Sequence, residues 1–218
     1  MGKNLDWQTY QEQIKQLSTL DYNYDDKVYH QSTDKKDWFV DHYQAVLAQE
    51  PEGPPMPGGP FEKAKECLTL YQFPDPRLIQ AVYDPQQQLV GRNMLMFAHF
   101  TFFTFTFGVR VTAVEDEMHK NNLGEAETVW GYSYRTLKGH FEVGQIQFQI
   151  CKNHRSGEVR FKIEAYSRPD RIPNFFYRNG FKLFGRPLQK YFAKSSIRRL
   201  QHLADLSLQR LNAAATAN

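Results

Sequence analysis

The sequence predicts an α+β fold in which a curved antiparallel β-sheet grips a long C-terminal α-helix. Most residues between 89 and 167 alternate apolar and polar side chains, the period of two that half-buried strands show. From Leu188 onward, apolar residues recur at helical spacing, which predicts one long amphipathic helix. A curved sheet with one apolar face must be covered, and this helix is the largest element available to cover it.

A length of 218 residues favours one main domain, which we expect over residues 22–212. Residues 1–21 are expected to form an N-terminal helical extension and residues 213–218 a frayed tail. No run approaches the roughly 20 apolar residues of a membrane helix, and the N-terminus lacks the apolar core of a signal peptide. Cys67 and Cys151 have no metal or redox spacing, so small, partly buried thiols in the cytoplasm are expected.

The formal net charge of +3 hides an asymmetry along the chain. Residues 1–167 hold 17 Lys and Arg against 22 Asp and Glu, whereas residues 168–218 hold 10 against 2. An anionic partner should therefore meet the C-terminal segment.

In the first third of the chain, residues 5–20 have the apolar spacing of a short amphipathic helix, and residues 22–32 suit a first strand. Asp37 is placed to cap a helix over residues 38–49. Five Pro and three Gly between Pro51 and Pro60 predict a loop, and a further helix is expected over residues 60–71.

The pattern then changes to strands, with short ones expected over residues 78–82 and 89–98. The apolar positions are even-numbered between 94 and 102 but odd-numbered from 103 to 113. This change of phase predicts a β-bulge at Phe102-Phe103 that bends the sheet.

A polar loop is expected over residues 115–125. Beyond it, alternation predicts three long antiparallel strands, over residues 126–137, 144–151 and 158–167. Tight turns are expected at Lys138-Gly139-His140 and at residues 153–157. At the C-terminus, Pro173 suits the start of a short helix that Gly180, Gly185 and Pro187 interrupt before the long helix.

The hairpin block Tyr134-Arg135-Thr136-Leu137-Lys138-Gly139-His140, followed by Glu142, Gly144 and Phe148, resembles the family called domain of unknown function 1990. Ser167-Arg168-Pro169 and Leu188-Gln189 extend the resemblance, which covers roughly residues 22–205. Arg135, Lys138 and Gln145-Ile146 depart from the family's usual residues. The resemblance implies the START-like, helix-grip fold and no established activity.

His140 and Glu142 are the candidate catalytic residues, because both point to the same side of an extended segment and a carboxylate can orient an imidazole for proton transfer. They are equally candidates for a polar anchor at a pocket mouth. The alternative is that both cap the hairpin or bond to neighbouring backbone.

Trp130, Tyr132, Tyr134 and Thr136 share one strand face and are candidates for ligand binding together with His140 and Glu142. Facing inward, their rings and hydroxyls would line a cavity and orient a ligand. The alternative is packing against the helix with the hydroxyls bonded locally.

No metal site and no cofactor are expected. His99 lies alone among phenylalanines, and the other histidines lack metal spacing. Phosphate loops, dinucleotide fingerprints, nucleophile elbows and paired catalytic carboxylates are not found in the sequence.

Basic residues recur every four positions near the C-terminus and form a ridge if the helix is continuous. They are Arg178, Lys182, Arg186, Lys190, Lys194 and Arg198. With the neighbouring Phe175, Phe176, Tyr177, Phe181 and Phe184, this ridge suits an anionic membrane surface or an acidic partner. The alternative is an ordinary solvated face, and a pI of 8.7 without a recognition motif disfavours nucleic acid.

Three functions fit these features. The first is binding of a hydrophobic small molecule, such as a lipid, an isoprenoid or a polyketide-like ring, in a cavity between the sheet and the C-terminal helix. The second is an enzyme of cyclase, isomerase or hydrolase type with His140 as base and Tyr134 or Tyr132 stabilising an oxyanion. The third is an interaction protein that uses its basic C-terminal helix.

Overall fold

The computed structural model describes residues 5–31, 36, 38–100, 103–169 and 175–216. Its centre is one seven-stranded sheet in the order β1-β7-β6-β5-β4-β3-β2, with every neighbouring pair antiparallel. The strands are β1 (Phe39–Gln49), β2 (Ile79–Val82), β3 (Asn93–Phe100), β4 (Phe103–Lys120), β5 (Ala126–Thr136), β6 (Glu142–Asn153) and β7 (Glu158–Pro169). The helices are a 3₁₀ turn (Trp7–Tyr10), α1 (Gln11–Leu17), α2 (Asp26–Gln31), α3 (Pro60–Thr69) and α4 (Phe175–Thr216).

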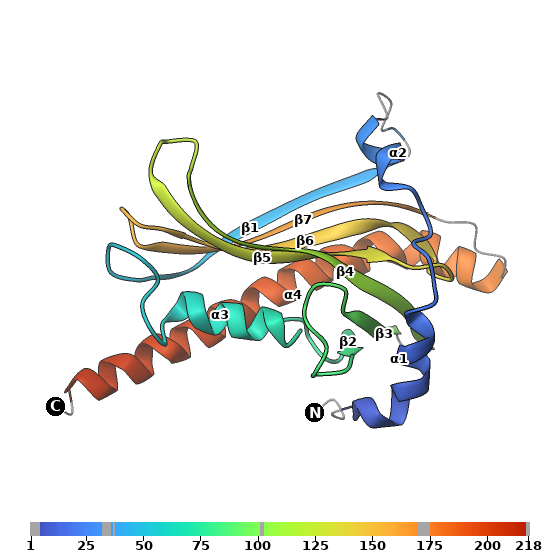
Figure 1. The fold of residues 1–218 in the computed structure, drawn as a ribbon, viewed down its shortest axis with the longest axis horizontal. Coiled ribbons are helices and arrows are strands. Elements are labelled where there is room, and N and C mark those ends of the chain that lie inside the picture. The colour runs from blue at the N-terminus through green and yellow to red at the C-terminus, as the bar shows by residue number, and fades with distance from the viewer. Residues whose placement is uncertain (1–4, 32–35, 37, 101–102, 170–174, 217–218) are drawn as a thin grey trace.

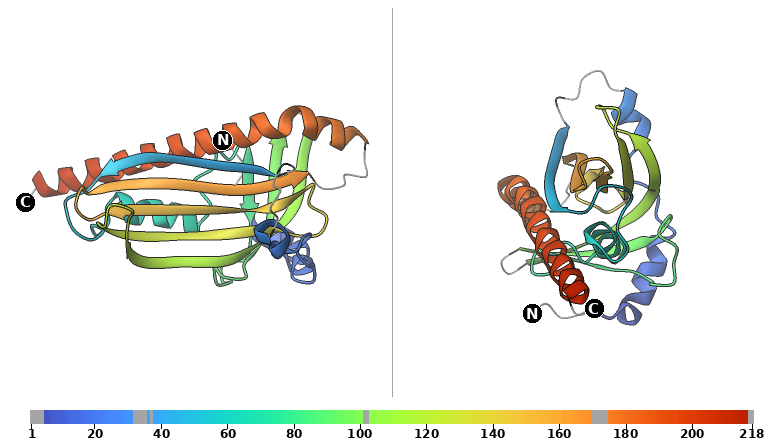
Figure 2. Two further views of the ribbon diagram at one scale, coloured as in Figure 1. Left: turned by 90° about the horizontal axis from the view of Figure 1, so that it is seen from above. Right: turned by 90° about the vertical axis from the view of Figure 1, so that its left-hand side faces the viewer.

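Helix α4 runs along the length of the strands on the concave side of the sheet, next to the shorter α3 (Figures 1 and 2). Its inward side packs into the core, where Ala193, Leu200 and Ala204 are almost completely buried. The fold is therefore the predicted curved sheet gripping a long C-terminal helix.

Smaller helices cover the opposite, convex face. Leu17 of α1 packs with Leu95 and Leu137, and α2 brings Tyr29 against Tyr166 of β7. The predicted N-terminal helical extension is thus present as the 3₁₀ turn and α1.

The prediction of a helix over residues 38–49 was wrong, because this segment is strand β1 at the edge of the sheet. Its apolar residues do not all face one side: Val40 and Val46 are exposed, whereas Leu47 is buried in the core. When an edge strand also carries apolar residues on its solvent-exposed face, the spacing of apolar residues in its sequence resembles that of a helix. The strand expected over residues 22–32 was also wrong, since its second half forms α2 and Tyr22 makes only an isolated bridge to Leu137.

Phe102 lies outside the described residues, and the antiparallel pairing of β3 with β4 on either side of it, not the predicted bulge, accounts for the change of phase. β3 and β4 pair antiparallel with Phe100 opposite Phe103, so even positions of β3 share a face with odd positions of β4. A register shift does occur in β4, but between Val111 and Ala113. The loop expected over residues 115–125 is shorter than predicted, because β4 continues to Lys120.

The predicted break near Pro187 is absent, because α4 is continuous from Phe175 to Thr216 with Pro187 inside it. The side chains of residues 175–186 lie outside the described part of the structure, and so does Pro173. Within the described ranges, no helix is both long and apolar enough to cross a membrane.

Candidate functional site

The turn between β5 and β6 forms as predicted and places His140 at the end of the sheet. Gly139 has a φ of +94°, which favours glycine, and the His140 N–H donates to the Leu137 carbonyl at 3.1 Å. The His140 side chain folds inward from this turn, and the residue is only 8% exposed.

The imidazole of His140 is held neutral inside the protein. Its Nδ1 accepts a hydrogen bond from the Glu142 N–H at 2.9 Å, and its ring centroid lies 4.3 Å from that of Phe107. Burial lowers the pKa of His140 to about 3. Because Nδ1 is the acceptor, the neutral ring carries its proton on Nε2, which is a hydrogen-bond donor.

Two tyrosine hydroxyls meet beside this end of the sheet. The hydroxyl oxygen of Tyr134 on β5 lies 3.4 Å from that of Tyr71, which follows α3. Burial raises the pKa of Tyr134 to about 12, to which the negative charge of Glu142 adds, and burial also raises that of Tyr71. Tyr71 has a φ of +52°, a left-handed conformation that is uncommon for a residue with a side chain.

Glu142 connects the sheet to the long helix, because its Oε1 accepts a hydrogen bond from Nε2 of Gln189 on α4 at 2.8 Å. These polar side chains come from the loop after α3, from β5, from β6 and its preceding turn, and from α4, and Glu142 lies close enough to Tyr134 to help raise its pKa. We call this set the interior polar cluster; its members are Tyr71, Tyr134, His140, Glu142 and Gln189.

An apolar surface adjoins the cluster on the concave side of the sheet. Residues that face each other across neighbouring strands share a face, and the pairs here are Ile79 with Ala98, Ala98 with Phe105, and Ile146 with Tyr134. We call these side chains, which are only partly buried, the apolar wall; its members are Ile79, Ala98, Phe105, Phe107 and Ile146.

The other predicted ligand-binding residues lie elsewhere. Trp130 and Tyr132 are 4% and 2% exposed in the core, and the Tyr132 hydroxyl donates to the Leu68 carbonyl at 3.2 Å. The Thr136 hydroxyl donates to Oδ1 of Asn23 at 2.6 Å and accepts the Gly144 N–H at 3.1 Å. The structure thus brings Tyr134, His140 and Glu142 together, while Trp130, Tyr132 and Thr136 are bonded or packed locally.

Two members of the cluster were missed by sequence reasoning. Gln189 belongs to the Leu188-Gln189 pair that carried the family resemblance, so a polar residue on the inward side of the helix was a signal available in the sequence. Tyr71 gives no local signal, because only the structure shows its left-handed backbone after α3.

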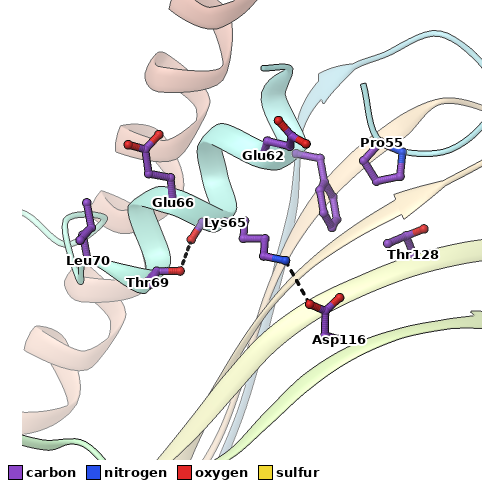
Figure 3. A pocket seen from close by; sticks show the side chains of 9 residues that line it. Pro55, Glu62, Lys65, Glu66, Thr69, Leu70, Asp116 and Thr128 are labelled. Atoms are coloured by element: carbon purple, nitrogen blue, oxygen red, sulfur yellow. Dashed lines mark hydrogen bonds and ion pairs between the residues drawn. The ribbon is translucent and has the colours of Figure 1, made fainter. Parts of the chain in front are cut away.

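A separate groove lies between α3 and the strands β4 and β5, with a volume of about 690 Å³ (Figure 3). Its lining residues are Pro55, Phe61, Glu62, Lys65, Glu66, Thr69, Leu70, Asp116 and Thr128. Nζ of Lys65 crosses the groove to Oδ2 of Asp116 at 3.1 Å and lies 5.3 Å from the centroid of the Trp130 ring (Figure 3 shows the ion pair). None of the six predicted site residues lines this groove.

Among the described residues, no three His, Cys, Asp or Glu side chains gather as metal ligands. Cys67 and Cys151 are both buried and unpaired with each other, and burial raises the pKa of each thiol to about 11. Neither thiol is therefore poised as a nucleophile at neutral pH.

The curved sheet, the long helix in its concave face and the polar cluster between them define a helix-grip protein. The chain belongs to the family described as domain of unknown function (DUF1990), whose model matches residues 23–199. No curated protein matches the sequence significantly.

Comparison with solved structures finds similarity at low identity. Ara h 8.0201 is 11% identical, with 77% of this chain and 97% of that chain covered and a TM-score of 0.39. Major latex-like protein 151 from Panax ginseng is 10% identical, with 76% and 97% covered and a TM-score of 0.46. A norcoclaurine synthase point mutant from Thalictrum, in complex with a transition-state analogue, is 10% identical, with 79% and 96% covered and a TM-score of 0.45.

Proposed function

We propose that this protein binds a hydrophobic small molecule, of lipid, isoprenoid or polyketide-like character, between the concave face of the sheet and the first half of α4. The observation that carries the proposal is the position of the interior polar cluster directly beside the partly exposed apolar wall. An apolar surface with a few convergent polar groups is the general character of a small-molecule site.

The interior polar cluster places more polar groups between the sheet and the helix than packing requires. Apolar side chains such as Phe148 and Leu200, which are fully buried, close part of the rest of the sheet–helix interface. Burying hydroxyl, imidazole and carboxylate groups costs free energy unless each is hydrogen-bonded. Tyr71 also keeps a bulky side chain at a left-handed position, where glycine is the usual residue.

The charge state of the cluster favours a ligand with a neutral polar end. The Tyr71 and Tyr134 hydroxyls are protonated at neutral pH, and His140 is uncharged with its proton on Nε2. These groups can donate hydrogen bonds to a carbonyl or hydroxyl oxygen. We therefore propose that the polar end of the ligand is a neutral ketone or alcohol, which needs no countercharge from these uncharged donors.

The alternative of a cyclase, isomerase or hydrolase with His140 as base is less favoured by this geometry. A general base works best when its pKa is near the working pH, and burial lowers the pKa of His140 to about 3. Its Nδ1 is also occupied by the Glu142 N–H. The cluster therefore fits binding and orientation better than proton abstraction.

The alternative of an interaction protein is supported by the middle of the interior, which the protein's own side chains fill. Phe73, Phe148 and Phe161 lie there with no exposed surface, and Phe192 of α4 packs against the first two. We infer that a ligand is confined to the end of the sheet that carries the apolar wall, and does not extend toward Trp130.

Native mass spectrometry of gently purified protein, followed by solvent extraction, tests the proposal. We expect a stoichiometric apolar molecule bearing a hydroxyl or carbonyl group. Ile79→Trp, which places bulk on the apolar wall, should lose the bound mass, whereas Thr112→Val should keep it, because the Thr112 hydroxyl bonds to the Ser133 carbonyl away from the wall.

Two results would count against the proposal. One is a clean unliganded mass for the wild type that persists after incubation with lipid extracts. The other is a bound molecule that Ile79→Trp retains in full while the variant remains folded.

A further inference from the structure

The outward face of α4 is strongly basic. Lys190, Lys194 and Arg198 are exposed and succeed each other at intervals of four residues, so they form one ridge along the continuous helix. Three more basic residues of the predicted ridge, Arg178, Lys182 and Arg186, have side chains outside the described part of the structure.

The ridge has no acidic counterpart nearby in the sequence. Residues 171–204 contain eight Lys and Arg and no Asp or Glu, and the first acidic residue of α4 is Asp205. The rest of the chain holds 19 Lys and Arg against 24 Asp and Glu. The molecule is therefore polarised, with its positive side on α4, and such an asymmetry orients a protein on an anionic surface.

The described part of the chain supplies no acidic partner for the ridge cations. Among the described residues, Lys190, Lys194 and Arg198 make no ion pair. The neighbouring Arg199 is not part of the ridge: it donates from Nε to the Gln72 carbonyl at 2.7 Å and lies close enough to Asp75 to help lower the pKa of that carboxyl.

An exposed aromatic side chain lies within the ridge, and an exposed apolar one lies near the neighbouring Arg199. Tyr191, within the ridge, is 49% exposed. Leu70 is 43% exposed and stands two residues before Gln72, whose carbonyl binds Arg199 of α4. Tyrosine is enriched where a protein meets the headgroup region of a membrane, because its ring is apolar and its hydroxyl is polar.

We propose that the outward face of α4 docks on an anionic lipid membrane surface, with Lys190, Lys194 and Arg198 facing the headgroups and Tyr191 entering the interfacial region. The exposed aromatic residue among the cations, Tyr191, favours a membrane over a nucleic acid, whose backbone needs charge alone. The proposal stands independently of ligand binding, because it uses the solvent side of α4 and not its inward side.

Sedimentation of the full chain with vesicles tests this surface. The probes are vesicles of phosphatidylcholine alone and of phosphatidylcholine with about one third phosphatidylserine, at low and high salt. We expect binding only to the anionic vesicles and its loss at about 1 M salt, where the Debye length shrinks to about 3 Å.

A matched pair of triple variants locates the contact. Lys190→Glu/Lys194→Glu/Arg198→Glu and Lys15→Glu/Lys27→Glu/Lys120→Glu each reverse three exposed cations, so both change the formal net charge from +3 to −3. Each basic residue near an anionic surface is worth about fivefold in partitioning. We expect the α4 variant to lose about a hundredfold or more and the control to lose much less.

Equal loss in both variants would overturn the proposal, because net charge alone would then explain the binding. Equal binding to neutral and anionic vesicles would overturn it too. The proposal would also be overturned if the protein did not bind vesicles but bound RNA or an acidic peptide tightly, because the face would then belong to that class of partner. Circular dichroism confirms that both variants keep the fold, and Tyr191→Ala should weaken binding to anionic vesicles by about threefold to tenfold.

Discussion

Nζ of Lys152 lies 3.0 Å from Oε2 of Glu50, and neither side chain has any exposed surface. Lys152 also donates to the Pro51 carbonyl at 2.7 Å, and Glu50 accepts the backbone N–H groups of Met56 at 3.0 Å and Phe61 at 2.8 Å. This buried ion pair ties the proline-rich loop and the start of α3 to the end of β6. Because its members are also hydrogen-bonded to backbone, the cost of removing both charges from water is partly offset.

Lys152→Met should therefore lower the free energy of unfolding by about 3–5 kcal/mol, since it leaves the Glu50 carboxylate buried without its cation. Urea denaturation followed by circular dichroism measures this loss. Adding Glu50→Gln to the variant should recover part of it, because Gln removes the uncompensated charge and keeps an acceptor for a backbone N–H.

An exposed ion pair provides the control. Nζ of Lys138 lies 2.7 Å from Oδ2 of Asp21, with side chains that are 61% and 79% exposed. Lys138→Met should cost under about 1 kcal/mol, because water screens this pair. A similar loss in both lysine variants would mean that burial does not strengthen the Lys152–Glu50 pair.

The strands near the middle of the chain were predictable because one of their faces is exposed to solvent and the other is buried. Ile146, Phe148 and Ile150 alternate with three glutamines, and the alternation survives in β6. β1 was mistaken for a helix, since Val40 and Val46 are exposed on an edge strand and obscure the alternation.

The candidate site was predictable only for those of its residues that are close together in the sequence. Tyr134, His140 and Glu142 lie within nine residues of each other around one hairpin turn, so their proximity follows from the turn. Tyr71, which follows α3, contacts Tyr134, and Gln189 of α4 contacts Glu142. Both contacts depend on how the helices pack against the sheet. No spacing in the sequence encodes such a contact.

Gly144→Ala should disrupt the pairing of β6 with β7. A Cβ at this position would lie 2.3 Å from the Tyr166 carbonyl oxygen, a collision with backbone that a rotamer change cannot relieve. We expect a loss of about 3 kcal/mol in unfolding free energy. Gly91→Ala is the comparison, because its added Cβ meets nothing within 4 Å and only its φ of +80° is unfavourable, at about 1 kcal/mol. A loss at Gly144 no larger than that at Gly91 would contradict the predicted collision.

Tyr71→Phe separates the role of the hydroxyl from that of the ring. The ring stays in the core, and the hydrogen bond that is lost is long, at 3.4 Å. The unfolding free energy should therefore change by less than about 1 kcal/mol. If the hydroxyl meets the ligand, the ligand affinity measured by native mass spectrometry on serial dilution should fall about fivefold to tenfold, the usual effect of one neutral hydrogen bond. A large stability loss with unchanged affinity would instead assign Tyr71 to the core alone.

His140 should make the protein less stable in mild acid. In the folded state burial lowers its pKa from 6.5 to about 3, so between these values the unfolded chain binds more protons than the folded one. The stabilising contribution is full above about pH 6.5 and is lost progressively as the pH falls toward 3. Between pH 6.5 and about pH 5 the loss should be roughly 1.5 kcal/mol.

His140→Asn should lack this part of the pH dependence, because its side-chain oxygen can accept the Glu142 N–H but does not titrate. Urea denaturation of both proteins at the two pH values gives the difference directly, since every other ionisable group is shared. If the two proteins lose stability in parallel, His140 is protonated in the folded state at mild acidity, and the neutral donor assigned to it in the polar cluster is wrong.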